Sequence, residues 1–421
     1  MDLKKIGAIG GAISLALCWP LAVGQIGQSV IQDGIAHLSN ESLQAEIVDY
    51  DRGYLTSSVK TRYTVLDPVL AEQLAVDGLP SEIVVNSQVS HGLFSLKAES
   101  VLDDADGLPL TLNTVTQLNG NTDYVLQLAN WHQVTEGPDG AIVSITPSTL
   151  KGHASVLGDL TYQLDIPSVE IDFNSGEKML LAGLTGEGQG KKINSFWIGE
   201  QTLTLEQASV LDVDQAPLFS VTDSQYTFVS SYEEMEQTVS SQHLVELKDL
   251  LMAGDKIESI TMDLSFGDLD SVAFEHLLKL YQNNPMPSND DIEAAIPHVD
   301  NLFAKGFYLA MNKMAVKLGA DSEFETNWTI TVPKGTENVT DNFAMILPAL
   351  TGDLKTFVSH GLVTQYPFIE QGVNEAMAME LVQRTEQGFE IQAELQEGNL
   401  VFENGQKMPL LALLLPALMQ P

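Results

Sequence analysis

The residues most capable of chemistry in this sequence belong to two short stretches, DRGYLTSS and SHGLFS. Arg52 and Tyr54 in the first stretch are of residue types that often bind ligands. His91 in the second stretch precedes a glycine, where its ring could act as a base or hydrogen-bond the neighbouring backbone. Arg52, Tyr54 and His91 are therefore the candidate binding residues, and the sequence nominates no catalytic residue.

A structural interpretation of DRGYLTSS is the stronger one. Asp49 and Asp51 flank Arg52, so we expect a local ion pair that orients the entrance to a strand. Gly53 would permit a bulge or close packing beside Tyr54. The stretch is therefore predicted to be a strand-entry device, and ligand binding is the alternative.

Familiar catalytic and metal-binding motifs are absent from the sequence. No nucleophile elbow, zinc-protease motif, P-loop or cysteine nucleophile occurs, and the histidines are not spaced as metal ligands. Residues 186–192, GEGQGKK, lack the setting of a phosphate cradle and predict a flexible loop. Residues 103–107, DDADG, predict a turn, because Leu102 and Asn113 occupy the terminal ligand positions of a calcium loop. We therefore expect neither a metal nor a cofactor.

The charge of the chain excludes one class of partner. Asp and Glu number 57 against 20 Lys and Arg, which gives a formal net charge of −37. Such a surface repels nucleic acid phosphates and anionic headgroups at long range. We expect a solvated acidic surface and no nucleic acid partner.

The N-terminus has the pattern of an export signal. Lys4 and Lys5 precede an uncharged apolar stretch from Ile6 to Val23. Its length approaches that of a membrane-spanning helix, about 20 residues, which favours an uncleaved signal anchor with the lysines in the cytoplasm. Cleavage near Gly24 of a signal peptide, which would release a soluble periplasmic protein, is the alternative. Cys18 is the only cysteine, so the exported part has no disulfide.

Period-two alternation dominates from about residue 45 to 230. Strands are indicated over 55–65, 83–89 and 160–173, with turn sequences between such segments at 104–107, 118–123, 136–140 and 174–177. This pattern predicts a long antiparallel meander with one buried face.

The second half of the chain adds helical patterns. Apolar residues at helical spacing predict a helix over 231–251 and another over 271–282, and further helical segments are expected around 341–385. Residues 306–318 and 322–332 predict strands, and a final hairpin should turn at Glu397 and Gly398. The leucine-rich stretch 409–419 is too short to span a bilayer and predicts a terminal helix that docks on the sheet.

Together these patterns predict an α+β fold. Residues 1–24 form the signal anchor or signal peptide, which is a transmembrane or signal helix. Residues 25–230 form a large twisted antiparallel β meander, and residues 231–421 form an α+β region with a terminal β-hairpin and an apolar C-terminal segment. Helices are concentrated in the second half.

Several motifs give the chain a resemblance to the YdgA-like family of bacterial envelope proteins, whose function is unknown. The family's early strand motif is matched by Tyr50, Arg52, Gly53, Tyr54, Ser57 and Ser58. Further matches are the His-Gly strand at His91, FGDLD at 266–270, the Gly-plus-strand unit at 306–318, and the ending LQEGNLVFENGQKMP. The chain departs from the family at Leu93, where a proline is usual. The resemblance implies export and anchoring in the inner membrane facing the periplasm, and it carries over no catalytic residue.

We expect a non-enzymatic, membrane-anchored periplasmic protein of the cell envelope, acting as a scaffold or binding module for a lipid or an envelope partner. One alternative is a periplasmic hydrolase with carboxylates from distant loops and His91 or His132 in a polar cleft. The other is a purely homomeric structural protein. A concave surface lined by Leu, Ile and Phe would favour the first function, converging carboxylates in a polar cleft the second, and a broad flat apolar patch instead of a groove the third.

Overall fold

The computed structural model describes residues 43–412 except 77–79, 104–106, 136, 138–139, 253, 284–287 and 342–345. Before residue 43 it describes Val23, Gln25, 27–29, 31–32, Ile35 and Ser39. The predicted signal anchor apart from Val23, most of the 104–107 turn and the end of the leucine-rich segment therefore lie outside the described residues. No helix in the described part of the chain has the length and apolar character needed to cross a bilayer.

Strands dominate the fold. The structure is 60% strand and 19% helix. Hydrogen bonds join 22 strands of the described residues into one large sheet, and every pair with a described register is antiparallel. The chain divides into two compact units. Unit 1 comprises residues 1–174 and 184–189, and unit 2 comprises residues 175–183 and 190–421.

Unit 1 is an antiparallel meander with one small helix. Its strands are β1 (Leu43–Arg52), β2 (Thr56–Val65), β3 (Glu82–His91), β4 (Ser95–Leu102), β5 (Leu110–Gln117), β6 (Thr122–Leu128), β7 (Trp131–Val134), β8 (Ala141–Ile145), β9 (Ser148–Ala154) and β10 (Asp159–Phe173), with α2 (Pro68–Val76) between β2 and β3. Neighbours pair in the order β1, β2, β3, β4, β5, β6, β9 and β10. Since successive turns of such a sheet alternate between its two ends, the β1–β2, β3–β4, β5–β6 and β9–β10 turns share one end.

The core of unit 1 is closed by residues that precede the sheet. Val59, Val89 and Leu96 on β2, β3 and β4 form a buried cluster with Val23, which is 1% exposed. The described residues from Val23 to Ile35 are helical. The face of the sheet in this region is therefore covered by the chain that enters it.

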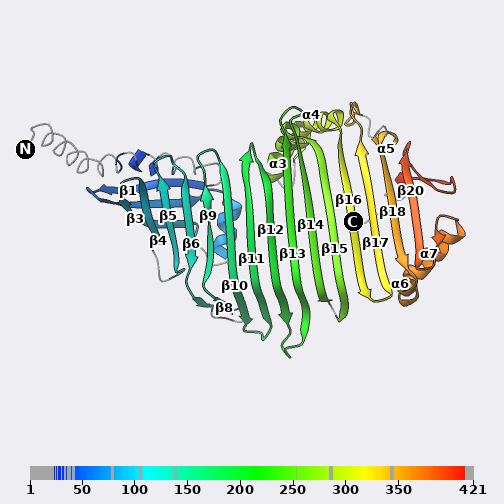
Figure 1. Cartoon of the computed structure of the whole chain (residues 1–421), viewed down its shortest axis with the longest axis horizontal. Coiled ribbons are helices and arrows are strands. Elements are labelled where there is room, and N and C mark those ends of the chain that lie inside the picture. The colour runs from blue at the N-terminus through cyan, green and yellow to red at the C-terminus, as the bar shows by residue number, and fades with distance from the viewer. Residues whose placement is uncertain are drawn as a thin grey trace, which may run out of the picture. The chain divides into compact units, whose positions relative to one another are not determined.

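Unit 2 contains the longest strands. After β11 (Lys178–Ile193), which contributes to both units, come β12 (Phe196–Leu211), β13 (Pro217–Glu233), β14 (Thr238–Met252), β15 (Asp255–Asp270), β16 (Phe307–Gly319), β17 (Ser322–Val332), β18 (Thr351–Ser359), β19 (Gln383–Arg384), β20 (Gly388–Gln396), β21 (Asn399–Phe402) and β22 (Lys407–Pro409). From β12 to β18 each strand pairs with the next, and β20 follows β18. Figure 1 shows strands β12 to β18 side by side.

The helices of unit 2 lie at the ends of these strands (Figure 1). They are α3 (Ser271–Asn283), α4 (Asn289–Lys305), α5 (Ile346–Ala349), α6 (His360–Gln365) and α7 (Pro367–Ala378). One buried cluster joins α3 and α4 to the ends of β14 and β15 through Val239, Leu269, Ala273 and Leu302. A second buried cluster lies where α5 meets β17, β18 and β20. A third lies where α6 and α7 meet β20. These clusters of unit 2 therefore lie near the strand ends, whereas Ala310, Met311 and Ala315 are buried within β16.

The motif FGDLD marks one of these strand-to-helix junctions. Asp270 caps α3 by accepting a hydrogen bond from the Ala273 backbone N–H at 2.8 Å. A Cβ on Gly267 would lie 2.0 Å from the ring of Tyr308 on the neighbouring strand. Only glycine leaves room for that ring, which explains the glycine at this point of the sequence.

Three groups of predicted elements are confirmed. Helix α3 covers the pattern predicted at 271–282, β17 covers 322–332, and β16 matches the strand predicted at 306–318 except that it begins at Phe307. The final hairpin turns at Glu397 and Gly398 between β20 and β21. Helices α5, α6 and α7 lie within the 341–385 segment, although β18 runs between α5 and α6.

Two other predictions are wrong. The helix predicted over 231–251 is strand β14, preceded by the end of β13. The apolar residues of β14 fit both helical and strand spacing. The segment forms a strand because it pairs with β13 and β15 along its length. The loop predicted at 186–192 lies within β11, where a Cβ on Gly190 would meet the ring of Trp197 at 2.8 Å. Glycines there allow close approach within a sheet and do not mark a loop.

Candidate functional site

His91 and Ser57 form a buried pair between two strands of unit 1. The His91 Nε2 atom lies 2.8 Å from the Ser57 hydroxyl oxygen, and its Nδ1 atom lies 3.4 Å from the Tyr54 carbonyl oxygen. The exposed fractions of Ser57 and His91 are 2% and 7%. Because a nucleophile must be reached by its substrate, this burial makes the pair a structural link between the β1–β2 turn and β3.

The turn that holds Tyr54 has a counterpart beside His91. The Gly53 N–H donates to the Thr56 carbonyl at 2.8 Å, and the Gly92 N–H donates to the Ser95 carbonyl at 2.9 Å. A Cβ on either glycine would lie within 3 Å of that carbonyl oxygen. The stretches DRGYLTSS and SHGLFS therefore build the same turn twice, on neighbouring hairpins of one sheet.

Arg52 is directed at the N-terminal helical residues. Its guanidinium donates hydrogen bonds to the side-chain oxygens of Gln25 and of Gln28, the latter at 3.4 Å. The predicted ion pair with Asp49 or Asp51 is not formed among the described residues. Arg52 thus ties the end of β1 to the segment that enters the sheet.

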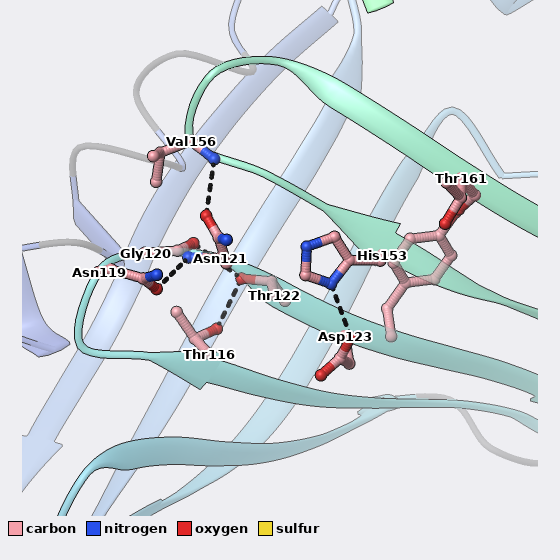
Figure 2. A network of polar contacts seen from close by, with 10 residues as sticks. Thr116, Asn119, Gly120, Asn121, Thr122, Asp123, His153, Val156 and Thr161 are labelled. Atoms are coloured by element: carbon pink, nitrogen blue, oxygen red, sulfur yellow. Dashed lines mark hydrogen bonds and ion pairs between the residues drawn. The ribbon is translucent and has the colours of Figure 1, made fainter. Parts of the chain in front are cut away.

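A polar network joins the next two turns at the same end of unit 1, as Figure 2 shows. The Asn121 side-chain oxygen accepts from the Val156 N–H at 3.2 Å, and the hydroxyls of Thr116 and Thr122 lie 3.0 Å apart. His153 Nδ1 lies 2.7 Å from an Asp123 carboxylate oxygen. These contacts hold the β5–β6 and β9–β10 turns together.

The arrangement expected of a hydrolase does not assemble around either candidate histidine in the described residues. His132 Nδ1 lies 3.0 Å from the Ser144 hydroxyl on an exposed part of β7, and His91 contacts Ser57 and a backbone carbonyl. A recess of about 60 Å³ gathers Glu380, Glu390 and Glu403, but no histidine lines it. Within the described ranges no His, Cys, Asp and Glu side chains cluster as a metal site would require.

The most extensive apolar feature is one face of the unit 2 sheet, which we call the apolar face. Strand register places the following residues on the same side: Leu203, Leu205, Tyr226, Phe228, Val245, Leu247, Ile260, Met262, Leu264, Met314, Val316, Phe324, Trp328 and Leu354. All of them are half-buried. The opposite side carries polar and charged residues such as Glu246, Asp263, Lys313, Glu325 and Lys355.

A histidine lies among the aromatic rings of the apolar face. The Tyr226 hydroxyl is 2.8 Å from His243 Nδ1, and the Ser241 hydroxyl is 3.2 Å from Nε2. The rings of Phe228 and Phe266 lie 5.0 Å and 6.0 Å from the His243 ring. Burial lowers the pKa of His243. Both ring nitrogens have a hydroxyl partner, so the neutral ring is accommodated without a charged neighbour.

The sequence did not single out this cluster or a second histidine pair. His243 falls in the segment predicted as a helix, where strand-to-strand contacts could not be anticipated. On α3 and α4 the rings of His276 and His298 stack with their centroids 4.4 Å apart. Burial, and then the nearby His276, lower the pKa of His298. His276 and His298 lie within two successive helices, so no short spacing in the sequence could reveal the pair.

These features define a strand-rich protein with an apolar sheet face and no assembled catalytic centre among its described residues. The chain belongs to the family described as "Bacterial protein of unknown function (DUF945)", which matches residues 3–411. This is the family of the YdgA-like proteins that the sequence motifs predicted. Searches of curated proteins and of solved structures each returned no match.

Proposed function

We propose that this protein is an exported, non-enzymatic binding module of the bacterial envelope that is anchored in the inner membrane, faces the periplasm and holds lipid acyl chains. The observation that carries the proposal is the apolar face of unit 2, whose Leu, Ile, Met and Phe residues remain half-buried in the middle of the sheet. The described helices lie at the strand ends (Figure 1), and among the described residues Phe228, Val245 and Met262 in the middle of that face belong to no buried cluster.

An apolar face of this extent favours a ligand that removes it from water. Monomeric proteins rarely expose contiguous apolar patches larger than a few hundred Å², and covering such surface gains about 25 cal/mol per Å². On β15 the same side of the sheet carries Ile260, Met262 and Leu264 of the apolar face and then Phe266, a run of roughly 20 Å at about 3.3 Å per residue. One leaflet of hydrocarbon is about 15 Å thick, so an extended acyl chain fits along a strand.

The membrane location is supported by the N-terminal residues. Cleavage near Gly24 would remove Val23, a residue of the unit 1 core that is 1% exposed. Retention of Val23 keeps the apolar stretch from Ile6 onwards attached to the folded sheet. An uncleaved signal anchor is therefore the arrangement that leaves this core intact.

The proposal is tested by the amount of lipid that copurifies with the full-length protein. Wild type, a double variant of the apolar face (Val245→Asn, Met262→Asn) and a control on the opposite face (Leu244→Asn, Thr261→Asn) would be purified in the same detergent. Phospholipid per chain would then be measured by mass spectrometry. Lipid around the anchor is common to all three proteins, so a difference between them reports on the sheet.

We expect the apolar-face variant to retain less than about half of the wild-type lipid, because two polar amides interrupt the contact, and the control to match wild type. Val245 and Met262 form a directly opposed pair, whereas Leu244 and Thr261 belong to the other face. Equal lipid in all three proteins would contradict lipid holding by this face and would favour an envelope protein or a second copy as its partner.

A further inference from the structure

The turns at one end of unit 1 share an unusual composition. Each of the β1–β2, β3–β4, β5–β6 and β9–β10 turns carries large apolar side chains that are exposed. This set, which we call the apolar rim, consists of Tyr54, Leu55, Leu93, Phe94, Leu118, Val156 and Leu157. Phe94 is 69% exposed and Leu157 is 84% exposed. Large apolar side chains exposed at turn tips leave much of their surface in water, so their presence on four turns at one end indicates a contact outside the fold.

The rim is held as one surface and does not consist of independent loops. The Leu118 N–H donates to the Phe94 carbonyl at 3.3 Å, which links the second turn to the third. The Val156 N–H donates to Asn121 at 3.2 Å, which links the third turn to the fourth (Figure 2). His91 and Ser57 link the first turn to the second.

The polypeptide enters the sheet beside this rim. Gln25 accepts from Arg52, the last residue of β1 before the first turn. A Cβ on Gly27 would meet the side chain of Leu96, the second residue of β4 after the second turn. Ser39, further along, hydrogen-bonds Ala45 near the start of β1, at the opposite end of the sheet. The N-terminal residues thus run from the rim end towards the other end.

We propose that the apolar rim rests in the interfacial layer of the bilayer that holds the N-terminal anchor. This inference depends on the membrane anchoring in the proposed function. The uncharged stretch begins at Ile6 and ends at Val23, which is itself packed between Val59, Val89 and Leu96. No linker separates the apolar stretch from the folded sheet, so an anchor in the bilayer holds the rim at the membrane surface.

The chemistry of the rim suits that layer. Tyr and Phe side chains favour the boundary between headgroups and acyl chains, and short apolar side chains there add contact area. A chain with a formal net charge of −37 cannot rely on attraction to anionic lipids, so apolar contact must supply the binding. Two carboxylates beside the rim, Asp123 and Asp159, have hydrogen-bond partners in His153 and Ser155.

The test places a reporter on the rim of the full-length protein. In a Cys18→Ser background, which removes the only cysteine, an environment-sensitive fluorophore would be attached to Phe94→Cys or Leu157→Cys. The matched control is Val69→Cys on α2, which is 75% exposed and follows the far end of β2. Each protein would be reconstituted into phosphatidylethanolamine–phosphatidylglycerol vesicles that contain a lipid with a nitroxide just below its headgroup.

We expect all labelled proteins to float with the vesicles, and the nitroxide to quench both rim labels at least about twofold more strongly than the control label. Flotation with equal quenching at Phe94, Leu157 and Val69 would overturn the rim proposal while leaving the anchor intact. Failure to float would overturn both. Rim labels that are shielded from an aqueous quencher only at high protein density, without nitroxide quenching, would assign the rim to contact with a second copy and overturn the membrane proposal.

Discussion

The two units of this sheet expose their apolar residues in opposite ways. In unit 1 a sheet face is covered by the entering chain, with Val23 packed on Val59, Val89 and Leu96, and exposed apolar side chains gather at turn tips. In unit 2 the tightly buried clusters lie near the strand ends, and the middle of the apolar face stays half-buried. The same sheet architecture thus yields a closed core in one unit and an open surface in the other. Within the part of the chain that the structure describes, what differs is whether another segment packs on the middle of the face.

The largest expected effect is a difference in stability when the same substitution, Val→Asn, is made in the unit 1 core and on the apolar face of unit 2. Val59 is 2% exposed in the unit 1 cluster, whereas Val245 is half-buried on the apolar face. We expect Val59→Asn to lower the free energy of unfolding of unit 1 by about 3 kcal/mol, because it buries an amide and removes core contacts. Val245→Asn should lower that of unit 2 by less than about 1 kcal/mol. Hydrogen exchange of peptides from each unit in denaturant measures both values.

Equal losses at the two positions would show that the apolar face is covered in the isolated protein and would contradict the comparison. Leu244 neighbours Val245 in β14 and lies on the opposite side of the sheet. Leu244→Asn is therefore the control for the general effect of an amide side chain on a long strand. Its loss should match that of Val245→Asn, since neither side chain lies in a buried cluster of the described residues.

The sequence predicts the strands of this fold better than their partners. Alternation identifies β2 from its own residues, because burial follows period two along a strand. The segment that forms β14 contains apolar residues at both helical and strand spacing, and only pairing with β13 and β15 distinguishes them. Local periodicity contains no information about a neighbouring strand, so this element was predicted wrongly.

The candidate residues show the same limit. Arg52, Tyr54 and His91 stand out by residue type, and the structure places the Tyr54 carbonyl beside the His91 ring. Their shared partner, Ser57, is found only when the register of β2 and β3 is known, since it sets Ser57 opposite Val89. The apolar face likewise depends on register across the unit 2 strands and could not be located from one strand alone.

A smaller difference in stability is expected when the serine is removed from each of the two serine–histidine contacts. Ser57 is buried and its hydroxyl lies 2.8 Å from His91, whereas Ser241 is half-buried and lies 3.2 Å from His243. We expect Ser57→Ala to destabilise unit 1 by about 1–2 kcal/mol, because a buried ring nitrogen loses its partner. Ser241→Ala should cost less than about 0.5 kcal/mol, since Ser241 is only half-buried and its contact with His243 is longer. Denaturant titration followed by hydrogen exchange of β3 and β14 peptides separates the two.

The Ser57→Thr variant serves as the control for the hydroxyl itself. It keeps the donor and adds a methyl group in a buried position, so any loss beyond that of Ser57→Ala would report crowding. If Ser57→Ala left unit 1 as stable as wild type, the pair would be incidental to the link between the first two turns.

The smallest effect is a pH dependence confined to unit 2. Burial lowers the folded-state pKa of His243, and burial with the neighbouring His276 lowers that of His298. A histidine whose pKa is lowered by folding binds protons more readily when unfolded, so stability is retained above the ordinary value of about 6.5 and falls as the pH drops from there through the folded pKa. Acidification from pH 7.5 to 5.5 should therefore weaken unit 2 more than a His243→Gln, His298→Gln variant. Hydrogen exchange of β14 and α4 peptides at both pH values measures this difference.

An identical pH response in the two proteins would mean that both histidines protonate as freely in the fold as in the unfolded chain. The apolar face would then be wetter around His243 than its aromatic neighbours indicate.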